Sequence, residues 1–522
     1  MATNPGFSSV GGGSKSESDP LIASAVVFST ALFGFFYIRF LIGRLEGTQL
    51  AWFAVALLGV KTVVEIVASF YAFAYLFNAV AYLCSPRRMG ARIRTSRDTP
   101  AVALLYLCCD DLDEDALLSL QDLDYSGPLY LILHDDSSRR ESRAALNALA
   151  DSLRRRGRWK VIVLRRPFRT GGKPGAINYV LDRTAHLYEY FLLLDNDSTV
   201  VDPETIQKIL PYFDRPEVAA VQCRPVAAES STYCTANRLL ARAIGAFHVI
   251  LSPCARFGWV PFVGHNAMLR TRHVVGVGGL TPGFFSDDLD LTVRLNLEGL
   301  SVLYAPDVFM AEKHPPHYAA FRKRSYKWAF GCMQTLKRHS GAVLISGRFT
   351  LAQQVSFFQF VGFYLMQAVL LAYLVVAFIL APIVFGAYPV SIGINAVFGA
   401  LLVFLVYLPF LAYFLTEDRR PGWFRSLILC GLVYGGADFS VARGVWDGLW
   451  YRSRPWIPTN SVVTGKNGRR DLAEALFGMA LLGGPFTRFP ALLYVPSIYL
   501  FAGKFLFGPA LSILYEDPGF PL

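Results

Sequence analysis

Two aspartates that follow a run of strand-forming residues are the first candidates for metal chemistry in this chain. Residues 191–194 read Phe-Leu-Leu-Leu, and Asp195, Asn196 and Asp197 come directly after them. In an open α/β sheet, ligands bind beyond the carboxyl ends of the strands. Two carboxylates at such a place suit a hard divalent cation and the phosphates it carries. The same pattern also occurs in solvated turns, so its weight depends on the motifs that follow it.

A second acidic cluster lies in residues 286–290, which read Ser-Asp-Asp-Leu-Asp and begin a predicted helix that ends near Gly299. The helix dipole favours acids in a first turn, so simple N-capping is one explanation. Three carboxylates within five residues are more than a cap needs. Because crowded acids raise one another's pKa, the cluster is also a candidate for a general base.

Basic and aromatic side chains appear in two further segments. Residues 170–178 read Thr-Gly-Gly-Lys-Pro-Gly-Ala-Ile-Asn, and their flexible glycines would let Lys173 approach an anionic ligand, although the proline excludes a Walker-type loop. On a predicted amphipathic helix, Arg324 and Lys327 share one face beside Trp328. They could neutralise a diphosphate and stack on a sugar ring. The alternative is a membrane-surface helix with snorkelling cations and an anchoring tryptophan.

Three other patterns are weaker. Asp135 and Asp136 end a predicted strand, where an acid could accept hydrogen bonds from a nucleobase or ribose, or could cap the next helix. His314 and His317 have metal-like spacing, but the two prolines between them preclude a helix. The polar loop at 461–466, which reads Ser-Val-Val-Thr-Gly-Lys, indicates nothing by itself.

The elements that must position these residues alternate between strand and helix patterns. Helical patterns occur at 142–155 and 176–186. Strands are predicted at Val102–Leu107, Leu129–His134, Lys160–Leu164, Phe191–Leu194, Val218–Cys223 and Val302–Ala305. This alternation predicts a mostly parallel, doubly wound sheet within residues 98–316.

The flanking regions are too apolar for an ordinary soluble enzyme. Of the 522 residues, 53% are hydrophobic and only 17% are charged. The first 20 residues are rich in Gly and Ser and are expected to be disordered. Transmembrane helices are expected in three regions: about two in 21–83, two in 351–416, and one or two in 471–522. An amphipathic interface helix is expected at 317–345 and a second interfacial segment with a polar loop at 420–470.

The charge distribution predicts which side of the membrane holds the central domain. The formal net charge is +11, and basic clusters at 87–97, 322–338 and 419–420 flank apolar segments. This positive-inside pattern predicts a cytoplasmic domain, and it makes nucleic acid an unexpected partner. Lys61 and Glu65, which lie within a predicted span at i,i+4 spacing, are expected to form a structural ion pair.

Taken in order, the motifs resemble those of membrane-embedded, processive family-two glycosyltransferases, namely cellulose, curdlan and related β-glucan synthases, and more distantly chitin and hyaluronan synthases. The resemblance covers about residues 98–470. The family order is a nucleotide-site Asp, Asp-x-Asp, Thr-Glu-Asp, Gln-x-x-Arg-Trp and, in cellulose synthases, a Phe-x-Val-Thr-x-Lys gating loop. Here the corresponding segments are Asp136 or Asp135, then 195–197, 286–288, 324–328 and 461–466. Segments 172–178 and 264–270 resemble the family's Lys-x-Gly-Ala-Leu-Asn and Gly-Thr-x-Ala-x-x-Arg.

The resemblance implies a GT-A-type catalytic domain, Rossmann-like with a mostly parallel sheet, inserted between α-helical transmembrane segments. It implies a general base at Asp288 with Asp287 beside it, and Mg²⁺ or Mn²⁺ on Asp195 and Asp197. Acceptor contacts are implied for Trp328, His265 and Asn266. Nucleotide-sugar contacts are implied for Asp135, Asp136, Lys173, Asp195, Arg324, Lys327, Thr464 and Lys466.

Several positions depart from the family pattern. Ser-Asp-Asp replaces Thr-Glu-Asp, and the expected base is kept. Arg-x-x-Lys-Trp replaces Gln-x-x-Arg-Trp, and a lysine cannot make the bidentate phosphate contact of an arginine. Ser461 replaces the gating-loop phenylalanine, which puts cellulose-type gating in question.

The expected function is that of an inverting, metal-dependent glycosyltransferase in a multi-pass protein of the bacterial inner membrane. It would polymerise a nucleotide sugar, with UDP-glucose as the expected donor, into a β-1,3- or mixed-linkage β-glucan. The expected partners are this donor, the growing polysaccharide, the bilayer and export proteins. One alternative is a transferase that adds a single sugar to a lipid. Another is a non-catalytic transporter or scaffold that only binds nucleotide.

Overall fold

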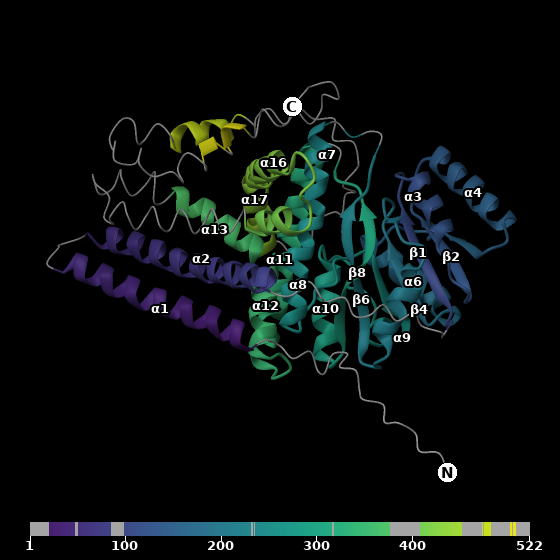
Figure 1. Cartoon of the computed structure of the whole chain (residues 1–522), viewed down its shortest axis with the longest axis horizontal. Helices are drawn as coiled ribbons and strands as arrows, with labels where there is room; N and C mark the ends of the chain where they lie inside the picture. The colour runs from purple at the N-terminus through teal and green to yellow at the C-terminus, as the bar shows by residue number, and fades with distance from the viewer. Residues whose placement is uncertain are drawn as a thin grey trace, which may run out of the picture.

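The chain divides into a domain built on a β-sheet and a set of apolar helices at one side of it. A computed structural model describes residues 20–46, 51–84, 99–230, 233, 235–315, 318–375, 408–450, 472, 474–481, 502–503 and 505–507. In Figure 1 the long helices α1 (Pro20–Leu45) and α2 (Trp52–Cys84) extend to the left, and the sheet lies to the right.

The eight strands form one sheet in the order β3-β2-β1-β4-β7-β6-β8-β5. Their bounds are β1 Val102–Cys108, β2 Leu129–Asp135, β3 Lys160–Leu164, β4 Tyr190–Leu194, β5 Thr199–Val200, β6 Val218–Ala227, β7 Ala267–Arg270 and β8 Ser301–Glu312. Strands β1 to β4 lie within a residue of the predicted bounds. Two short strands, β5 and β7, were not predicted.

The sheet contains both parallel and antiparallel strand pairs. Four neighbouring pairs are parallel, and three are antiparallel. All the antiparallel pairs involve β5 or β7. Because β7 is inserted between β4 and β6, it carries the loop before Ala267 to the carboxyl end of β4. The predicted mostly parallel sheet therefore holds for the β3-β2-β1-β4 half and for the β6-β8 pair, and the short strands β5 and β7 add the antiparallel pairs.

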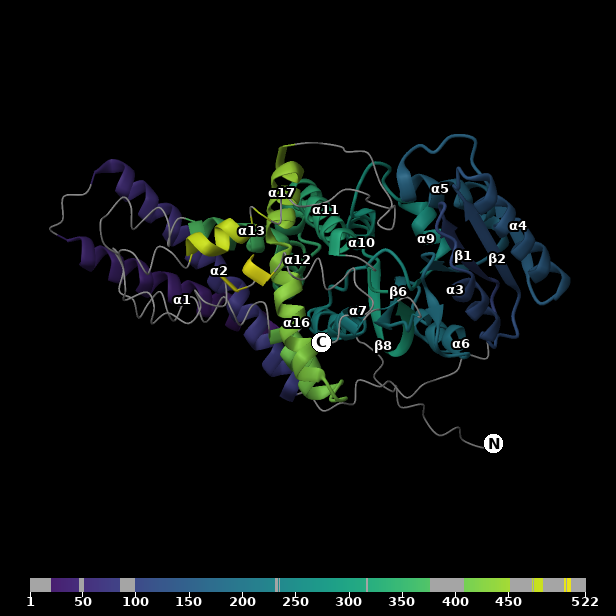
Figure 2. The same ribbon diagram turned by 90° about the horizontal axis from the view of Figure 1, so that it is seen from above.

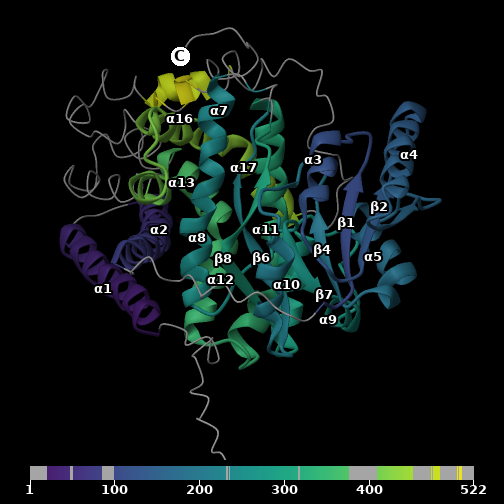
Figure 3. The ribbon, with the colours of Figure 1, turned by 45° about the vertical axis from the view of Figure 1, so that its right-hand side comes forward.

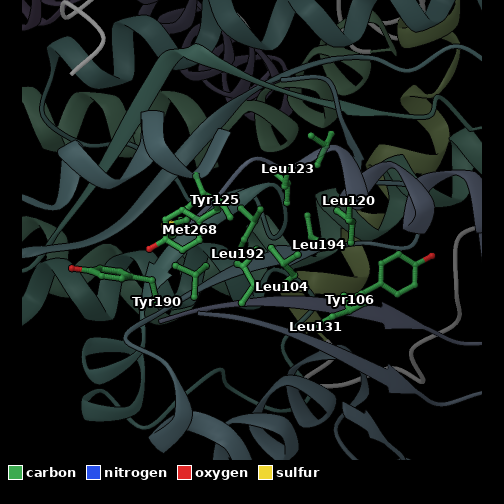
Figure 4. Close-up of a cluster of buried hydrophobic side chains, with 14 of the residues drawn as sticks. Leu104, Tyr106, Leu120, Leu123, Tyr125, Leu131, Tyr190, Leu192, Leu194 and Met268 are labelled. Carbon is green, nitrogen blue, oxygen red and sulfur yellow. The ribbon is translucent and has the colours of Figure 1, made fainter. Parts of the chain in front are cut away.

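Alternating residues of each strand divide the core into two layers. Leu104 and Tyr106 of β1 face one layer, and Ala103 and Leu105 face the other. Figure 4 shows the first layer. It is covered by α3 (Glu114–Ser119), α4 (Arg140–Arg155) and α6 (Thr205–Ile209). The second is covered by α5 (Gly172–Thr184), α8 (Phe247–Arg256), α9 (Thr271–Gly276) and α10 (Asp287–Leu297).

Four 3₁₀ turns and one further helix complete this domain. They are η1 Leu120–Asp122, η2 Ala185–Leu187, η3 Leu210–Phe213, η4 Arg242–Ala246 and α7 Thr235–Ala241. The run from Asn237 to Arg256 is apolar and long enough to cross a membrane, but it contacts β6 and β8 of the sheet. We therefore assign it to the sheet domain.

Two other helices, at Pro20–Gly43 and Leu58–Leu83, are also long and apolar enough to span a membrane. They pack side by side as α1 and α2 (Figure 2). The expected Lys61–Glu65 pair is formed, with a Nζ to Oε1 distance of 2.5 Å. Lys61 also donates to the Tyr37 hydroxyl at 3.1 Å and so links α2 to α1.

The span predicted from residue 351 onward is broken. Helices α12 (Leu351–Val361) and α13 (Phe363–Val375) meet at Gly362 with a bend of 57°. The Tyr71 hydroxyl of α2 occupies the space that a Cβ of Gly362 would need, and it donates to the Phe358 carbonyl at 3.1 Å. Glycine at this position therefore permits the close contact between α2 and α12. Residues 376–407 lie outside the described part of the chain.

A long helix, α11 (Tyr318–Ile345), lies between the sheet and the candidate membrane helices (Figures 2 and 3). Helix α17 (Asp438–Trp450) packs along it, and α16 (Trp423–Gly436) precedes α17 with a bend of 44°. A Cβ on Gly444 would lie 2.5 Å from the Tyr326 carbonyl oxygen, so the two helix backbones approach closely. A buried ion pair from Arg322 to Glu474, at 2.5 Å, also holds α11.

Candidate active site

The site lies where β1, β2 and β4 end at the same edge of the sheet. These strands are parallel, and Cys108 at the end of β1 is in register with Asp135 at the end of β2. Their carboxyl ends are followed by Asp110 and Asp111, by Asp135 and Asp136, and by Asp195 and Asp197. The topology therefore brings the predicted nucleotide-site acids and the predicted metal-site acids to one edge.

Lys173 joins this edge to the loop before β7. Its Nζ donates to Asp195 Oδ1 at 2.5 Å and to the Gly264 carbonyl at 2.8 Å. The predicted flexible loop is instead the first turn of α5, and Gly171 is its N-cap with φ 73°. A Cβ on Gly175 would clash with the Thr170 carbonyl oxygen, so this glycine serves close packing. Lys173 is consequently held on a rigid helix rather than on a mobile loop.

The two carboxylates of the Asp-x-Asp motif differ in charge state. Burial raises the pKa of Asp195, but the charges of Lys173 and His265 outweigh burial and lower it below the usual range. Burial, the Asp195 charge and the Glu312 charge raise the pKa of Asp197 to about 7. Asp197 is therefore a half-buried acid whose ionised form a nearby cation would favour.

The residues present fit a divalent cation only with help from a ligand. Among the described residues, no group of three or more His, Cys, Asp or Glu side chains is arranged to hold a metal ion. Asp195 and Asp197 supply oxygen ligands, and Mg²⁺ bound by one or two carboxylates completes its coordination with water and substrate phosphates. Two carboxylates of this kind could hold a divalent cation together with the phosphates of a nucleotide.

The acids of the predicted nucleotide site are both paired with arginines. Arg165 donates to Asp135 Oδ2 at 2.7 Å, and Arg166 donates to both carboxylate oxygens of Asp136 at 2.6 to 3.1 Å. Sequence reasoning missed these two arginines. They directly follow β3, so their place at the end of a third parallel strand was the available signal.

Sequence reasoning also missed the acids after β1. Burial raises the pKa of Asp111 to about 6. The hydrogen bond from the Cys109 N–H lowers this pKa, and the Asp195 charge raises it. Asn196 Nδ2 donates to the Asp111 carbonyl at 2.7 Å, which ties this loop to the Asp-x-Asp segment. An acid pair directly after the first predicted strand could have identified Asp111.

The acidic cluster of 286–290 separates into two parts. Burial and the Asp288 charge raise the pKa of Asp287, and burial raises the pKa of Asp288 as well. The Leu289 N–H donates to Asp288 Oδ1 at 2.8 Å, which favours ionisation of Asp288 over Asp287. A Cβ on Gly264 would lie 3.0 Å from Asp288 Oδ2, so this carboxylate lies beside the loop that Lys173 contacts.

Asp290, the third member of the cluster, belongs to the scaffold. Its carboxylate accepts hydrogen bonds from Thr281 at 2.6 Å, Arg294 at 2.8 Å and His339 at 2.8 Å. These contacts join α10 to α11 and leave two acids for chemistry. Ser286 is the N-cap residue of α10, but its side chain makes no capping hydrogen bond.

Helix α11 presents the predicted cation and aromatic residues. The Arg324 guanidinium lies 4.6 Å from the centre of the Trp328 ring, so it stacks on the indole. Burial and the Lys323 charge lower the pKa of Lys327 to about 7, against the opposing charge of Asp195. Lys327 therefore faces the Asp-x-Asp segment, and one face of Trp328 is covered by Arg324.

The two predicted acceptor residues before β7 are His265 and Asn266. His265 Nδ1 is 3.8 Å from Asp195 Oδ2, and its Nε2 contacts Glu312. Burial lowers the pKa of His265, but Glu312 and Asp195 outweigh burial and raise it to about 9. Asn266 is 1% exposed and has φ 51°, so this conformation does not present its amide to an acceptor. Thr464 and Lys466 lie outside the described residues.

Comparison with known proteins finds sequence similarity over much of the chain. Residues 190–416 match the family model described as glycosyl transferase family group 2. A probable glucomannan 4-beta-mannosyltransferase of Oryza sativa subsp. japonica is 26% identical over 266 residues, 49% of this chain and 43% of the relative. A beta-monoglucosyldiacylglycerol synthase of Nostoc sp. is 28% identical over 291 residues, 54% of this chain and 57% of the relative. The chain spans about half the length of these relatives.

The fold is also found in a solved structure. A mannosyltransferase from Pyrobaculum calidifontis, in complex with GDP-Man and Mn²⁺, superposes with a TM-score of 0.51 at 15% identity. The match covers 76% of this chain and 99% of that structure. At this identity the likeness establishes a GT-A-like fold. The family model and the two relatives together show that the chain is similar to glycosyltransferases, with residues 190–416 carrying its similarity to glycosyl transferase family group 2.

Proposed function

We propose that this chain transfers a sugar from a nucleoside-diphosphate sugar to a hydroxyl of its acceptor, with inversion at the anomeric carbon. The observation that carries the proposal is the placement of Lys173. It bonds Asp195 and the Gly264 carbonyl, and Gly264 lies against Asp288. A candidate metal ligand, Asp195, and a candidate base, Asp288, therefore lie near one lysine, where a sugar donor could meet its acceptor.

Asp288 is the proposed general base. Its raised pKa, from burial, moves its proton affinity toward that of a base working near neutral pH. It would take the proton from the acceptor hydroxyl as the C–O bond to the departing diphosphate breaks. Asp287 lies next to it in the first turn of α10 and shares its proton equilibrium.

The remaining residues would bind the donor. Asp195 and Asp197 would hold Mg²⁺ or Mn²⁺, which when bound offsets the charge that develops on the leaving diphosphate. Lys327 faces the same segment and would add a positive charge there. Asp136, which is 12% exposed and fixed by Arg166, would accept hydrogen bonds from the nucleoside.

We propose a β-glycan polymer as the product, with UDP-glucose as the donor and β-1,3 or mixed linkages. Support comes from α11, whose Lys327 charge acts on Asp195 and which packs against α17, α12 and α13. Such a helix connects the site to a membrane path. The name of the rice relative, a glucomannan mannosyltransferase, agrees with a polymer product.

The second candidate is addition of one sugar to a membrane lipid. The Nostoc relative is named for a glucosyldiacylglycerol product, which supports this alternative. Labelled UDP-glucose, UDP-galactose and GDP-mannose, offered to the purified full chain in nanodiscs, would separate the two. Label in an insoluble polymer indicates the polymerase, and label in an organic extract indicates the lipid transferase. No transfer from any donor would contradict the proposed function.

A further inference from the structure

We propose that Lys173 occupies the place of the metal at Asp195 until the donor arrives, so that the cation enters as its complex with a nucleoside diphosphate. The inference rests on the proposed function, because it takes Asp195 and Asp197 as the metal ligands. It adds an order of binding: free divalent metal binds weakly, and the diphosphate makes the metal site.

The first support is the position of the ammonium group. Lys173 Nζ lies 2.5 Å from Asp195 Oδ1, and its second hydrogen bond, to the Gly264 carbonyl at 2.8 Å, fixes it there. Metal–carboxylate distances are about 2.0 to 2.6 Å for Mg²⁺ and Ca²⁺. A cation on the same oxygen would therefore lie within a few ångströms of a fixed positive charge, which repels it strongly in a partly buried site.

The second support is the surrounding charge. The side chains of Lys173 and Asp195 are 18% and 33% exposed, so water screens them only in part. His265 lies 3.8 Å from Asp195 Oδ2, and the Lys327 charge also acts on Asp195. One carboxylate thus already faces three basic side chains. A bare divalent ion would gain little at this position.

A nucleoside diphosphate changes this balance. Its phosphate oxygens offer Lys173 and Lys327 a new anionic partner and supply the remaining metal ligands. With Lys173 drawn to the phosphates, Asp195 can join Asp197 on the cation. The lysine therefore couples metal binding to donor binding and keeps the acids in place while the site is empty of donor.

The test uses the full chain in detergent and measures binding alone. Mn²⁺ affinity is measured by electron paramagnetic resonance, with and without UDP. Lys173→Met should tighten binding of Mn²⁺ alone by at least about tenfold, because a repelling charge is removed. It should weaken binding of the Mn²⁺–UDP complex by at least about tenfold, because a phosphate partner is lost. A purely structural lysine would weaken both.

Lys208→Met is the matched control. Lys208 Nζ also lies 2.5 Å from an aspartate oxygen, Asp202 Oδ2, but on α6 outside the site. Lys208→Met should leave the affinities for Mn²⁺ alone and for the Mn²⁺–UDP complex unchanged. Lys173→Arg keeps the charge and should keep Mn²⁺ alone weakly bound. Lys173→Gln serves as a second uncharged variant if the methionine variant does not fold.

The inference is overturned if both uncharged variants bind Mn²⁺ alone no better than the natural chain. It is also overturned if Asp197→Asn, added to Lys173→Met, leaves the new Mn²⁺ signal intact, since the ion would then lie elsewhere. Neither readout needs turnover. Failure of sugar transfer with all donors would remove the proposed function, while opposite shifts in the two Mn²⁺ affinities would still establish the lysine's effect.

Discussion

Gly264→Ala tests the geometry of the proposed base with a single methyl group. Gly264 has φ 91°, and a Cβ built on it lies 3.0 Å from Asp288 Oδ2. The substitution therefore has two effects: it strains the backbone, and it pushes on the carboxylate. The carboxylate must move by a few tenths of an ångström, away from the loop that Lys173 contacts.

Thermal unfolding reports the backbone strain, and kcat reports the displacement of the Asp288 carboxylate. Left-handed backbone costs an alanine roughly 1–2 kcal/mol, which lowers the melting temperature by about 2–8 °C in a domain of this size. Displacing a general base by part of an ångström is expected to lower kcat by about tenfold, since a displacement of about 1 Å can cost a hundredfold. KM for the donor should change little.

Gly278→Ala isolates the backbone strain. Gly278 has a similar φ of 84°, and a Cβ there meets nothing within 4 Å. Both variants should lose similar stability in thermal unfolding, and only Gly264→Ala should lose turnover with a labelled donor. Equal kcat values for the two variants would refute the placement of Asp288 at the reacting atoms.

Three further predictions concern the site and the helix behind it. Burial raises the pKa of Asp288, so kcat/KM should begin to fall, as the pH is lowered, above the ordinary pKa range of aspartate. A pH–rate profile in which kcat/KM falls only near pH 4 would contradict a raised pKa for the base. Gly444→Ala should lower the melting temperature by overpacking α17 on α11, at a cost of about 1–3 kcal/mol, whereas Gly341→Ala, with open space on α11, should not. Arg322→Met should destabilise the chain by about 3–5 kcal/mol by breaking its buried ion pair with Glu474, and adding Glu474→Leu should recover stability in a double-mutant cycle.

The sequence was a good guide to the parallel half of the sheet. Strands β1, β2 and β4 are mostly apolar runs, as strands buried on both faces must be, and β3 is a partly exposed edge strand. The bounds of all four were predicted within a residue. β6 and β8 extend beyond their apolar cores, because Arg224 and Asp307 interrupt the pattern without ending the strands. β7 has only four residues, too few for a clear strand pattern, so its antiparallel insertion depends on tertiary contacts.

For the site, the positions were predictable and the partners were not. Acids after strands end up at one edge because parallel strands share a direction, so Asp136 and Asp195 could be selected in advance. Asp288 could be selected because three acids crowd the first turn of one helix. Their pairing with Arg166 and Lys173 joins segments about 20 to 30 residues apart, and no local pattern reports such contacts. The predicted mobile lysine loop became a helix because its glycines serve a cap and a close contact.

The central claim is that Asp288 deprotonates the acceptor while the Asp-x-Asp segment holds the donor. Its most direct test compares sugar transfer and UDP binding in the natural chain, in Asp288→Asn and in Asp182→Asn, an exposed aspartate on α5. We predict that Asp288→Asn loses at least about a hundredfold in kcat, the usual contribution of a general base, and binds UDP with unchanged affinity. Asp182→Asn should match the natural chain. Transfer by Asp288→Asn at the natural rate would contradict the account.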